Sequence, residues 1–137
     1  MSVDFADSLV AYLRAAPGVT ALAGVRVYPA ELPTTEAVSM PRYAVVVVPL
    51  GGGGPASDVH ALTPKIDITC YGATPKQARM LWLAVNAALR DLRRAVWAGC
   101  LLHSAVILAG PLQMRNPETH WPLAWGSWQM TVSTDEA

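Results

Sequence analysis

The sequence predicts an α+β fold, a two-layer sandwich in which an antiparallel or mixed sheet carries two main helices on one face. Apolar periodicity gives the order helix, strand, strand, strand, long helix, strand, strand. Most strands are joined by connections too short or too irregular to be crossover helices, which favours this class over a parallel sheet. The length of 137 residues predicts a single domain spanning residues 1–137 with its own core.

The N-terminal third is predicted to hold one helix, one short strand and a long loop. Apolar residues recur at spacings of three and four over Phe5–Ala16, as on one face of a helix, and Pro17-Gly18 is expected to stop it. A short turn and a strand over Val25–Tyr28 follow. The connection Ala30–Pro41 is longer than a turn requires, so we expect it to be a contact loop.

The next strand, Tyr43–Leu50, is apolar throughout and has valine at four consecutive positions. A strand with one wet face alternates polar and apolar residues, so both faces of this one are expected to be dry. We expect a neighbouring subunit to cover the second face. The segment Gly51–Leu62 is rich in glycine, proline and serine, which predicts a flexible loop. Its four glycines lead to Pro55 without the lysine of a phosphate-binding loop.

The C-terminal half is predicted to contain the long helix and three further strands. Lys65–Tyr71 alternates cleanly, so one of its faces packs on the core. Thr74 is expected to cap the long helix, Gln77 completes a capping box, and Gly99 is expected to end the helix. The remaining elements are a strand at Cys100–Leu112, a polar loop at Gln113–Trp121 and an alternating strand at Leu123–Ser133.

The composition indicates a protein that hides much of its surface. Apolar residues make up 53% of the chain and charged residues 15%, against about 45–50% and 25% in typical domains. No apolar run approaches the roughly 20 residues of a membrane-spanning helix, and Asp4 and Asp7 stand where a signal peptide would be basic. We therefore expect no membrane association, synthesis in the cytoplasm, and a homo-oligomer. Zero formal net charge disfavours binding through nucleic-acid phosphates.

Few residues suggest catalytic or metal chemistry. The two cysteines are expected to be buried thiols, because two cysteines without further close ligands do not make a metal site. The histidines are scattered, and no Gly-x-Ser-x-Gly nucleophile motif occurs. The sequence therefore predicts no enzyme, no cofactor and no metal. The cysteines are Cys70 and Cys100, and the histidines are His60, His103 and His120.

Two functional alternatives of other classes stay open at this point. An enzyme or enzyme subunit would place its site on His60, His103 or Asp67. A nucleic-acid-binding module would use the arginines late in the long helix, which also suit the negative end of the helix dipole. Those arginines are Arg90, Arg93 and Arg94.

Several segments form a pattern through their order and spacing. They are Val25–Pro29 (VRVYP) after the first helix, Leu32-Pro33, Met40–Val46 (MPRYAVV), Ile66–Gly72 (IDITCYG) before the long helix, and Trp125–Val132. Taken together, over about Phe5–Ser133, they resemble the tail-terminator or tail-completion proteins of long-tailed phages and gene transfer agents, including the tail-to-head joining proteins. Arg42 departs from the family pattern, as does the glycine run at Gly51–Gly54.

The resemblance implies a structural virion protein of the tail, at the head–tail interface. Such proteins form a ring, commonly a hexamer, on the last ring of the tail-tube protein. The ring stops tube growth and offers a surface to the head connector or stopper protein. DNA would pass through the lumen without being gripped, and no catalytic residue is carried over. A head-side stopper or adaptor is the alternative within the same class, because both are small ring-forming proteins.

Partner contacts are predicted from loop length and composition. The expected residues are Glu31, Thr34 and Glu36 in the first long loop, Gly52, Gly53, Asp58 and His60 in the glycine-rich loop, and Arg115 in the polar loop.

Overall fold

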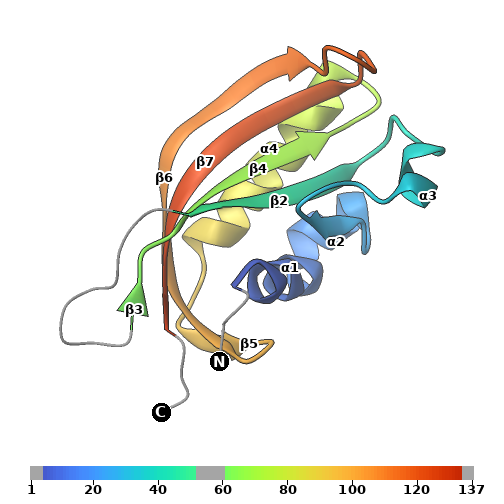
Figure 1. Cartoon of the computed structure of the whole chain (residues 1–137). Coiled ribbons are helices and arrows are strands. Elements are labelled where there is room, and N and C mark those ends of the chain that lie inside the picture. Colours follow the sequence, from blue (N-terminus) through green and yellow to red (C-terminus); the bar gives the residue numbers. More distant parts are fainter. Residues whose placement is uncertain (1–4, 52–60, 134–137) are drawn as a thin grey trace.

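The computed structural model describes residues 5–51 and 61–133 (Figure 1). The predicted flexible loop at Gly51–Leu62 therefore lies almost entirely outside the described residues. In chain order the elements are α1 (Phe5–Ala15), α2 (Pro17–Ala23), β1 (Val27–Pro29), α3 (Thr34–Ala37), β2 (Ala44–Gly51), β3 (Ala61–Leu62), β4 (Lys65–Tyr71), α4 (Pro75–Arg90), β5 (Ala95–Trp97), β6 (Cys100–Arg115) and β7 (Pro122–Ser133).

The described strands form one mixed sheet, as predicted. Its order is β1-β2-β4-β7-β6-β5, with β3 paired to the end of β7. β1 and β2 run parallel, and all the other pairs are antiparallel. At the centre, β4 and β7 pair without interruption from Lys65 opposite Gln129 to Tyr71 opposite Leu123.

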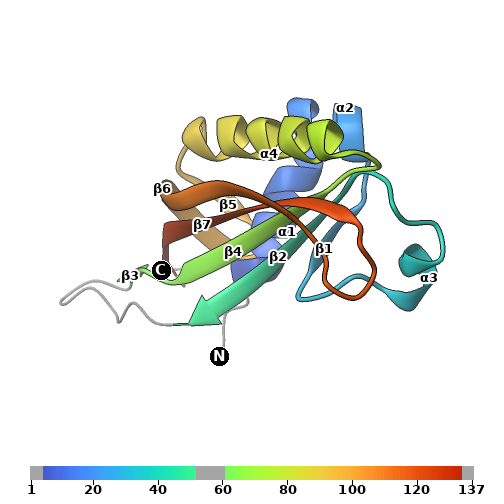
Figure 2. The ribbon, with the colours of Figure 1, turned by 90° about the horizontal axis from the view of Figure 1, so that it is seen from above.

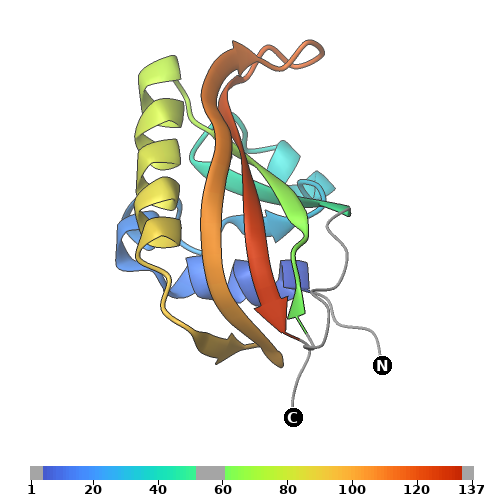
Figure 3. The same cartoon turned by 90° about the vertical axis from the view of Figure 1, so that its left-hand side faces the viewer.

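The sheet curls into a half-barrel, which corrects the predicted two-layer sandwich (Figures 1 and 2). β6 and β7 are 16 and 12 residues long, and the register of β6 shifts near Ser104, Leu108 and Gly110. Bulges bend a strand and increase its twist, so these long strands wrap around what packs on them. Both main helices, α1 and α4, lie on the concave face, as expected (Figure 3).

The core lies between the helices and the concave face. Trp82 of α4 packs on Trp128 of β7 with ring centroids 5.5 Å apart. The predicted inward faces of β4 and β7 are confirmed, because all their members are buried; these residues are Ile66, Ile68, Cys70, Ala124, Trp128, Met130 and Val132. The outward-facing positions of an alternating strand are normally exposed, yet Ser127 at such a position of β7 is buried and donates to the Ile66 carbonyl at 3.3 Å. The cause is the central place of β7 in the sheet.

Several predicted boundaries differ from the structure. Pro17 begins a second helix, α2, because proline is well placed in a first helical turn. The long helix ends at Arg90, well before Gly99. Ala98 and Gly99, both with positive φ, instead form the tight turn of the β5–β6 hairpin. Val96, which the predicted helix would have included, is consequently exposed on β5. The predicted loop Ala30–Pro41 contains the short helix α3.

The valine strand is dry on both faces over only half of its length. Ala44–Val47 are all buried within the single chain, so no neighbouring subunit is needed to cover them. Pro49 and Leu50 at its end are exposed. None of the described helices has the length and hydrophobicity to cross a membrane.

Candidate assembly interface

The outer edge of β6 is open over most of its length. β7 pairs with one side of β6 almost from end to end. On the other side, β5 reaches only Cys100–Leu102. From His103 to Arg115 none of the described strands lies along this outer side, onto which Figure 3 looks. The backbone groups of an open edge can pair with another strand.

Exposed apolar side chains accompany this edge. They are Val106, Ile107, Leu108, Leu112 and Met114, each between 41% and 59% exposed. Ser104–Met114 contains no charged residue. Proteins that stay monomeric guard such edges with lysines, prolines or bulges. On β6, Pro111 and the register shifts give part of this protection, but charged side chains are absent from Ser104–Met114. The edge is therefore long, uncharged and apolar, which is typical of a contact surface. We call Ser104–Met114 the β6 surface.

A hollow of about 400 Å³ adjoins the β6 surface on the convex face of the sheet. Trp125 pairs with Thr69 on one side and Leu112 on the other, so the three side chains lie on one face. Because Ala124 is directed to the core, its neighbour Trp125 is directed away from the helices. The hollow is lined by Thr69, Tyr71, Leu112, Met114, Asn116, Leu123 and Trp125.

The hollow is suited to an apolar side chain. Tyr71 stacks edge to face on Trp121, with ring centroids 5.9 Å apart. Burial raises the pKa of Tyr71, while a hydrogen bond with Asn116 opposes that shift, so the phenol stays neutral at ordinary pH. Three tryptophans lie close together in the sequence, at Trp121, Trp125 and Trp128. Trp128 is in the core, whereas Trp121 and Trp125 are only half-buried.

The opposite edge of the sheet, β1, is closed. Ala30 donates to Val47, and Val45 donates to Arg26, so the alternate positions Val27 and Pro29 face outward. The outward groups of these two residues already have partners. The Val27 carbonyl accepts from Arg14 Nη2 at 2.6 Å, and the Val27 N–H donates to Val25.

The proline at the end of β1 completes this closure. Pro29 has no N–H, and its carbonyl accepts from Glu31 at 2.8 Å. Where β2 extends beyond β1, the next outward position is Pro49, which offers no donor either. A further strand could therefore form few hydrogen bonds along this edge.

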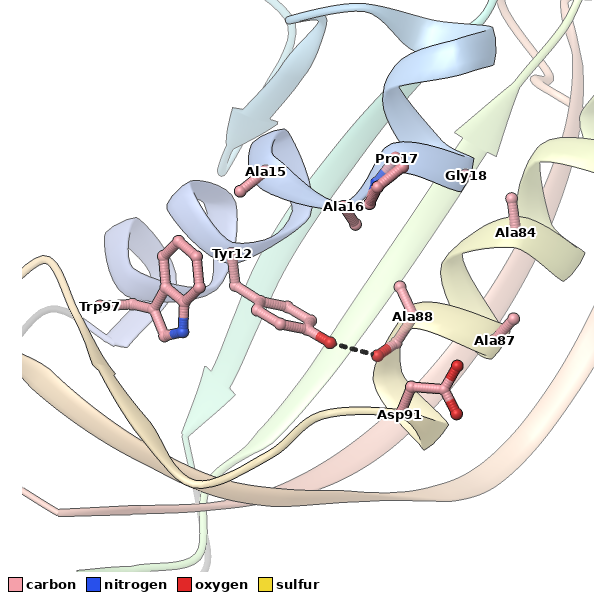
Figure 4. Close-up of a pocket in the computed structure, with 10 residues that line it drawn as sticks. All are labelled: Tyr12, Ala15, Ala16, Pro17, Gly18, Ala84, Ala87, Ala88, Asp91 and Trp97. Carbon is pink, nitrogen blue, oxygen red and sulfur yellow. Dashed lines mark hydrogen bonds between the residues drawn. The ribbon is translucent and has the colours of Figure 1, made fainter.

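A groove of about 340 Å³ lies between the α1–α2 corner and α4 (Figure 4). Small residues form most of its lining, among them Ala15, Gly18, Ala84 and Ala88. Tyr12 packs edge to face on Trp97, and its hydroxyl donates to the Ala88 carbonyl at 2.5 Å. Burial and the nearby Asp91 carboxylate raise the pKa of Tyr12. The lining offers shape but no nucleophile paired with a base.

The structure places the predicted contact residues at different sites. Glu31 and Thr34 are exposed, with Thr34 as the first residue of α3. Arg115 is exposed at the end of β6, beside the convex hollow, and donates to the His120 carbonyl at 3.0 Å. The predicted contacts Gly52, Gly53, Asp58 and His60 lie outside the described residues.

Glu36 was predicted as a surface contact, but its side chain is bound within the chain. It is 7% exposed, and its two oxygens accept from Arg42 Nε and Nη2 at 2.7 and 2.9 Å. The Tyr28 hydroxyl donates to the same carboxylate at 2.9 Å. A buried carboxylate needs such partners, and this one ties α3 to β1. Arg42, the departure from the family pattern, is the main partner.

Acid is expected to weaken this tie. The hydrogen bonds from Arg42 hold the pKa of Glu36 below its ordinary value. Its stabilisation is therefore complete above the unfolded pKa, about 4.3, and is lost as the pH falls through the lower folded pKa. We expect Glu36→Gln to lower the free energy of unfolding by about 1 kcal/mol at pH 7, a modest loss because Arg42 is partly exposed.

Urea unfolding at a series of pH values measures this effect. Glu36→Gln should flatten the fall in stability below about pH 4.3, where the carboxylate of the unfolded wild-type chain takes up a proton before that of the folded chain does. The exposed Glu31→Gln serves as the matched control and should leave that slope unchanged. If both variants keep the wild-type slope, the assigned role of Glu36 is wrong.

Sequence reasoning placed no contact on the β6 surface, although a signal was present. Val106–Ala109 lacks polar alternation in the same way as the valine strand. Such a run indicates either a strand covered on both faces or a strand covered by a partner. Strand order decides between the two, and the sequence does not specify that order.

Comparisons with known proteins add one finding about the fold. No protein-family model matches the chain, and no curated protein is similar to it in sequence. Among solved structures, a chain of the "Virion of native gene transfer agent (GTA) particle" is similar, with a TM-score of 0.69. The two chains are 18% identical, and the match covers 92% of each. At this identity the likeness shows that the two chains share a fold.

Proposed function

We propose that this chain is a structural protein of a phage-like particle, a tail terminator that forms a ring on the end of the tail tube. The open, uncharged β6 surface carries the proposal, because a water-soluble chain with such an edge needs a partner to cover it. The fold shared with a chain of a gene transfer agent virion supports it. The order and spacing of the sequence segments, which resemble those of tail-terminator proteins, also support the proposal.

The distribution of exposed apolar side chains suits such a role. A ring needs two unlike surfaces on every copy, and attachment to a tube needs a third. Besides the β6 surface, exposed apolar residues occur on α4 and on the β1–α3–β2 side of the molecule. They are Met80 and Leu83 on α4, and Val25, Val38 and Leu50 on the other side.

The charge balance suits a conduit for DNA. The chain carries 10 basic and 10 acidic residues, so its formal net charge is zero. A strongly basic lumen would retain DNA through its phosphates, whereas a neutral ring lets it pass. In this proposal the ring stops the growth of the tube and presents its free face to the head connector.

The mass of the protein in solution tests this function. We expect a closed ring of about six copies, formed either by the purified chain alone or upon addition of the tail-tube protein of the same particle. Multi-angle light scattering after gel filtration measures both cases. A stable monomer in both would contradict the proposal, and binding to the portal in place of the tube would favour a head-side stopper.

A further inference from the structure

The sheet has unlike edges, and this difference restricts what can cover β6. Among the described strands, β6 is open from His103 to Arg115. The β1 edge is closed by Arg14 and by the local bonds around Val27 and Pro29. A second copy therefore cannot extend the sheet by laying its β1 along β6, since the outward hydrogen-bonding groups of β1 are already occupied.

Among the described strands, ring symmetry also excludes the pairing of one β6 edge with the β6 edge of a neighbouring copy. Two β6 edges can pair with each other only about a two-fold axis, because each strand must play the same part for the other. Neighbours in a cyclic ring of six are related by rotation about the ring axis and share no such two-fold axis. This step rests on the proposed ring, within which the β6 edge stays open.

We propose that the β6 surface receives an extended strand of the tail-tube protein, which pairs edge to edge with Ser104–Met114. Main-chain hydrogen bonds would supply much of the affinity in this mode, and side-chain sockets would supply the selectivity. The convex row Val106, Leu112 and Met114 lies beside the incoming strand, since these residues pair with Gln129, Trp125 and Leu123 of the convex side of β7.

The chemistry of this surface defines the partner strand. Ser104–Met114 offers no charge to an acidic or basic segment, so the partner is uncharged over the paired stretch. Apolar side chains at every second position would face Val106 and Leu112. A large apolar side chain at one end would reach the hollow that Met114 and Trp125 line.

Val106→Lys tests the proposal, with Val96→Lys as the matched control. Both valines are exposed on strands, at 59% and 66%, so both variants should fold, and Val96 lies outside the proposed surface. We expect both variants to keep the wild-type ring mass. Binding to the tail-tube protein should weaken at least tenfold for Val106→Lys and stay within twofold of wild type for Val96→Lys.

Amide hydrogen exchange provides the second readout, because only a paired strand protects the backbone. In the wild-type ring alone, peptides within residues 104–114 should show a set of fast-exchanging amides. Saturating tail-tube protein should slow their exchange at least tenfold. A contact made by side chains alone would leave the exchange of these amides unchanged, and that result would overturn the proposal.

Two further outcomes would overturn the strand proposal and leave the ring intact as a hypothesis. One is slow exchange of residues 104–114 in the ring before any tube protein is added. The other is loss of the ring mass in Val106→Lys, since β6 would then join copies to one another. A wild-type chain that forms no ring and binds no tube protein would contradict the proposed function itself, and the strand proposal would fall with it.

Discussion

Replacement of Trp128 by alanine is expected to lower the free energy of unfolding by about 3–5 kcal/mol, the usual cost of removing a large buried aromatic side chain. Trp128 is 1% exposed and packs on Trp82, which joins β7 to α4. It also lies opposite Ile107 of β6 in the sheet, so it packs beside one residue of the β6 surface on the concave face. Urea unfolding followed by circular dichroism measures the loss.

The matched control is Trp125→Ala, three residues away on the other face of the same strand. Trp125 is half-buried and lines the convex hollow, so its loss should reduce stability by about 1 kcal/mol. Binding to the tail-tube protein should weaken clearly in this variant. Equal losses of stability in the two variants would contradict the assignment of Trp128 to the core and Trp125 to the contact face.

Replacement of Arg14 by leucine is expected to open the β1 edge. The variant leaves the carbonyl of the buried Val27 without its charged donor, which should reduce stability by about 1–2 kcal/mol. The larger effect is expected on association, because the freed Val27 carbonyl at the β1 edge could then accept a hydrogen bond from another copy. Light scattering at increasing protein concentration should show aggregates well beyond the size of a ring.

Arg14→Lys is the control for this prediction, since lysine keeps a charged donor on a long side chain. It should associate much less than Arg14→Leu at the same concentration. If the leucine variant keeps the wild-type particle size at all concentrations, Arg14 does not guard the edge. A loss of stability without aggregation would show that Val25 and Pro29 close the edge without its help.

Features built from neighbouring residues were predictable from the sequence. The alternation of β4 marked its core face, because successive side chains of a strand point to opposite faces. Thr74 caps α4 by accepting from the Gln77 N–H, and the Gln77 side chain accepts from the Ala73 N–H. Both signals involve residues close together in the sequence, so they do not depend on how distant parts of the chain pack.

Features that depend on distant residues were not predictable. The curl of the sheet comes from bulges in β6 whose positions depend on its pairing with β7. The hydrogen bond from Arg14 to the Val27 carbonyl joins α1 to β1, and no residue spacing in the sequence predicts it. Of the predicted contact residues, Glu36 proved to be buried because Arg42 and Tyr28 come together around it.

The closed β1 edge gives the sheet a valence of one. A sheet with two open edges can add strands at both ends, and each added copy exposes a fresh edge, so growth continues into a fibril. With Val27 and Pro29 already bonded, a strand that joins at β6 meets no continuation on the far side of the molecule. Each copy can therefore accept one added strand, and the sheet does not grow further from its other edge.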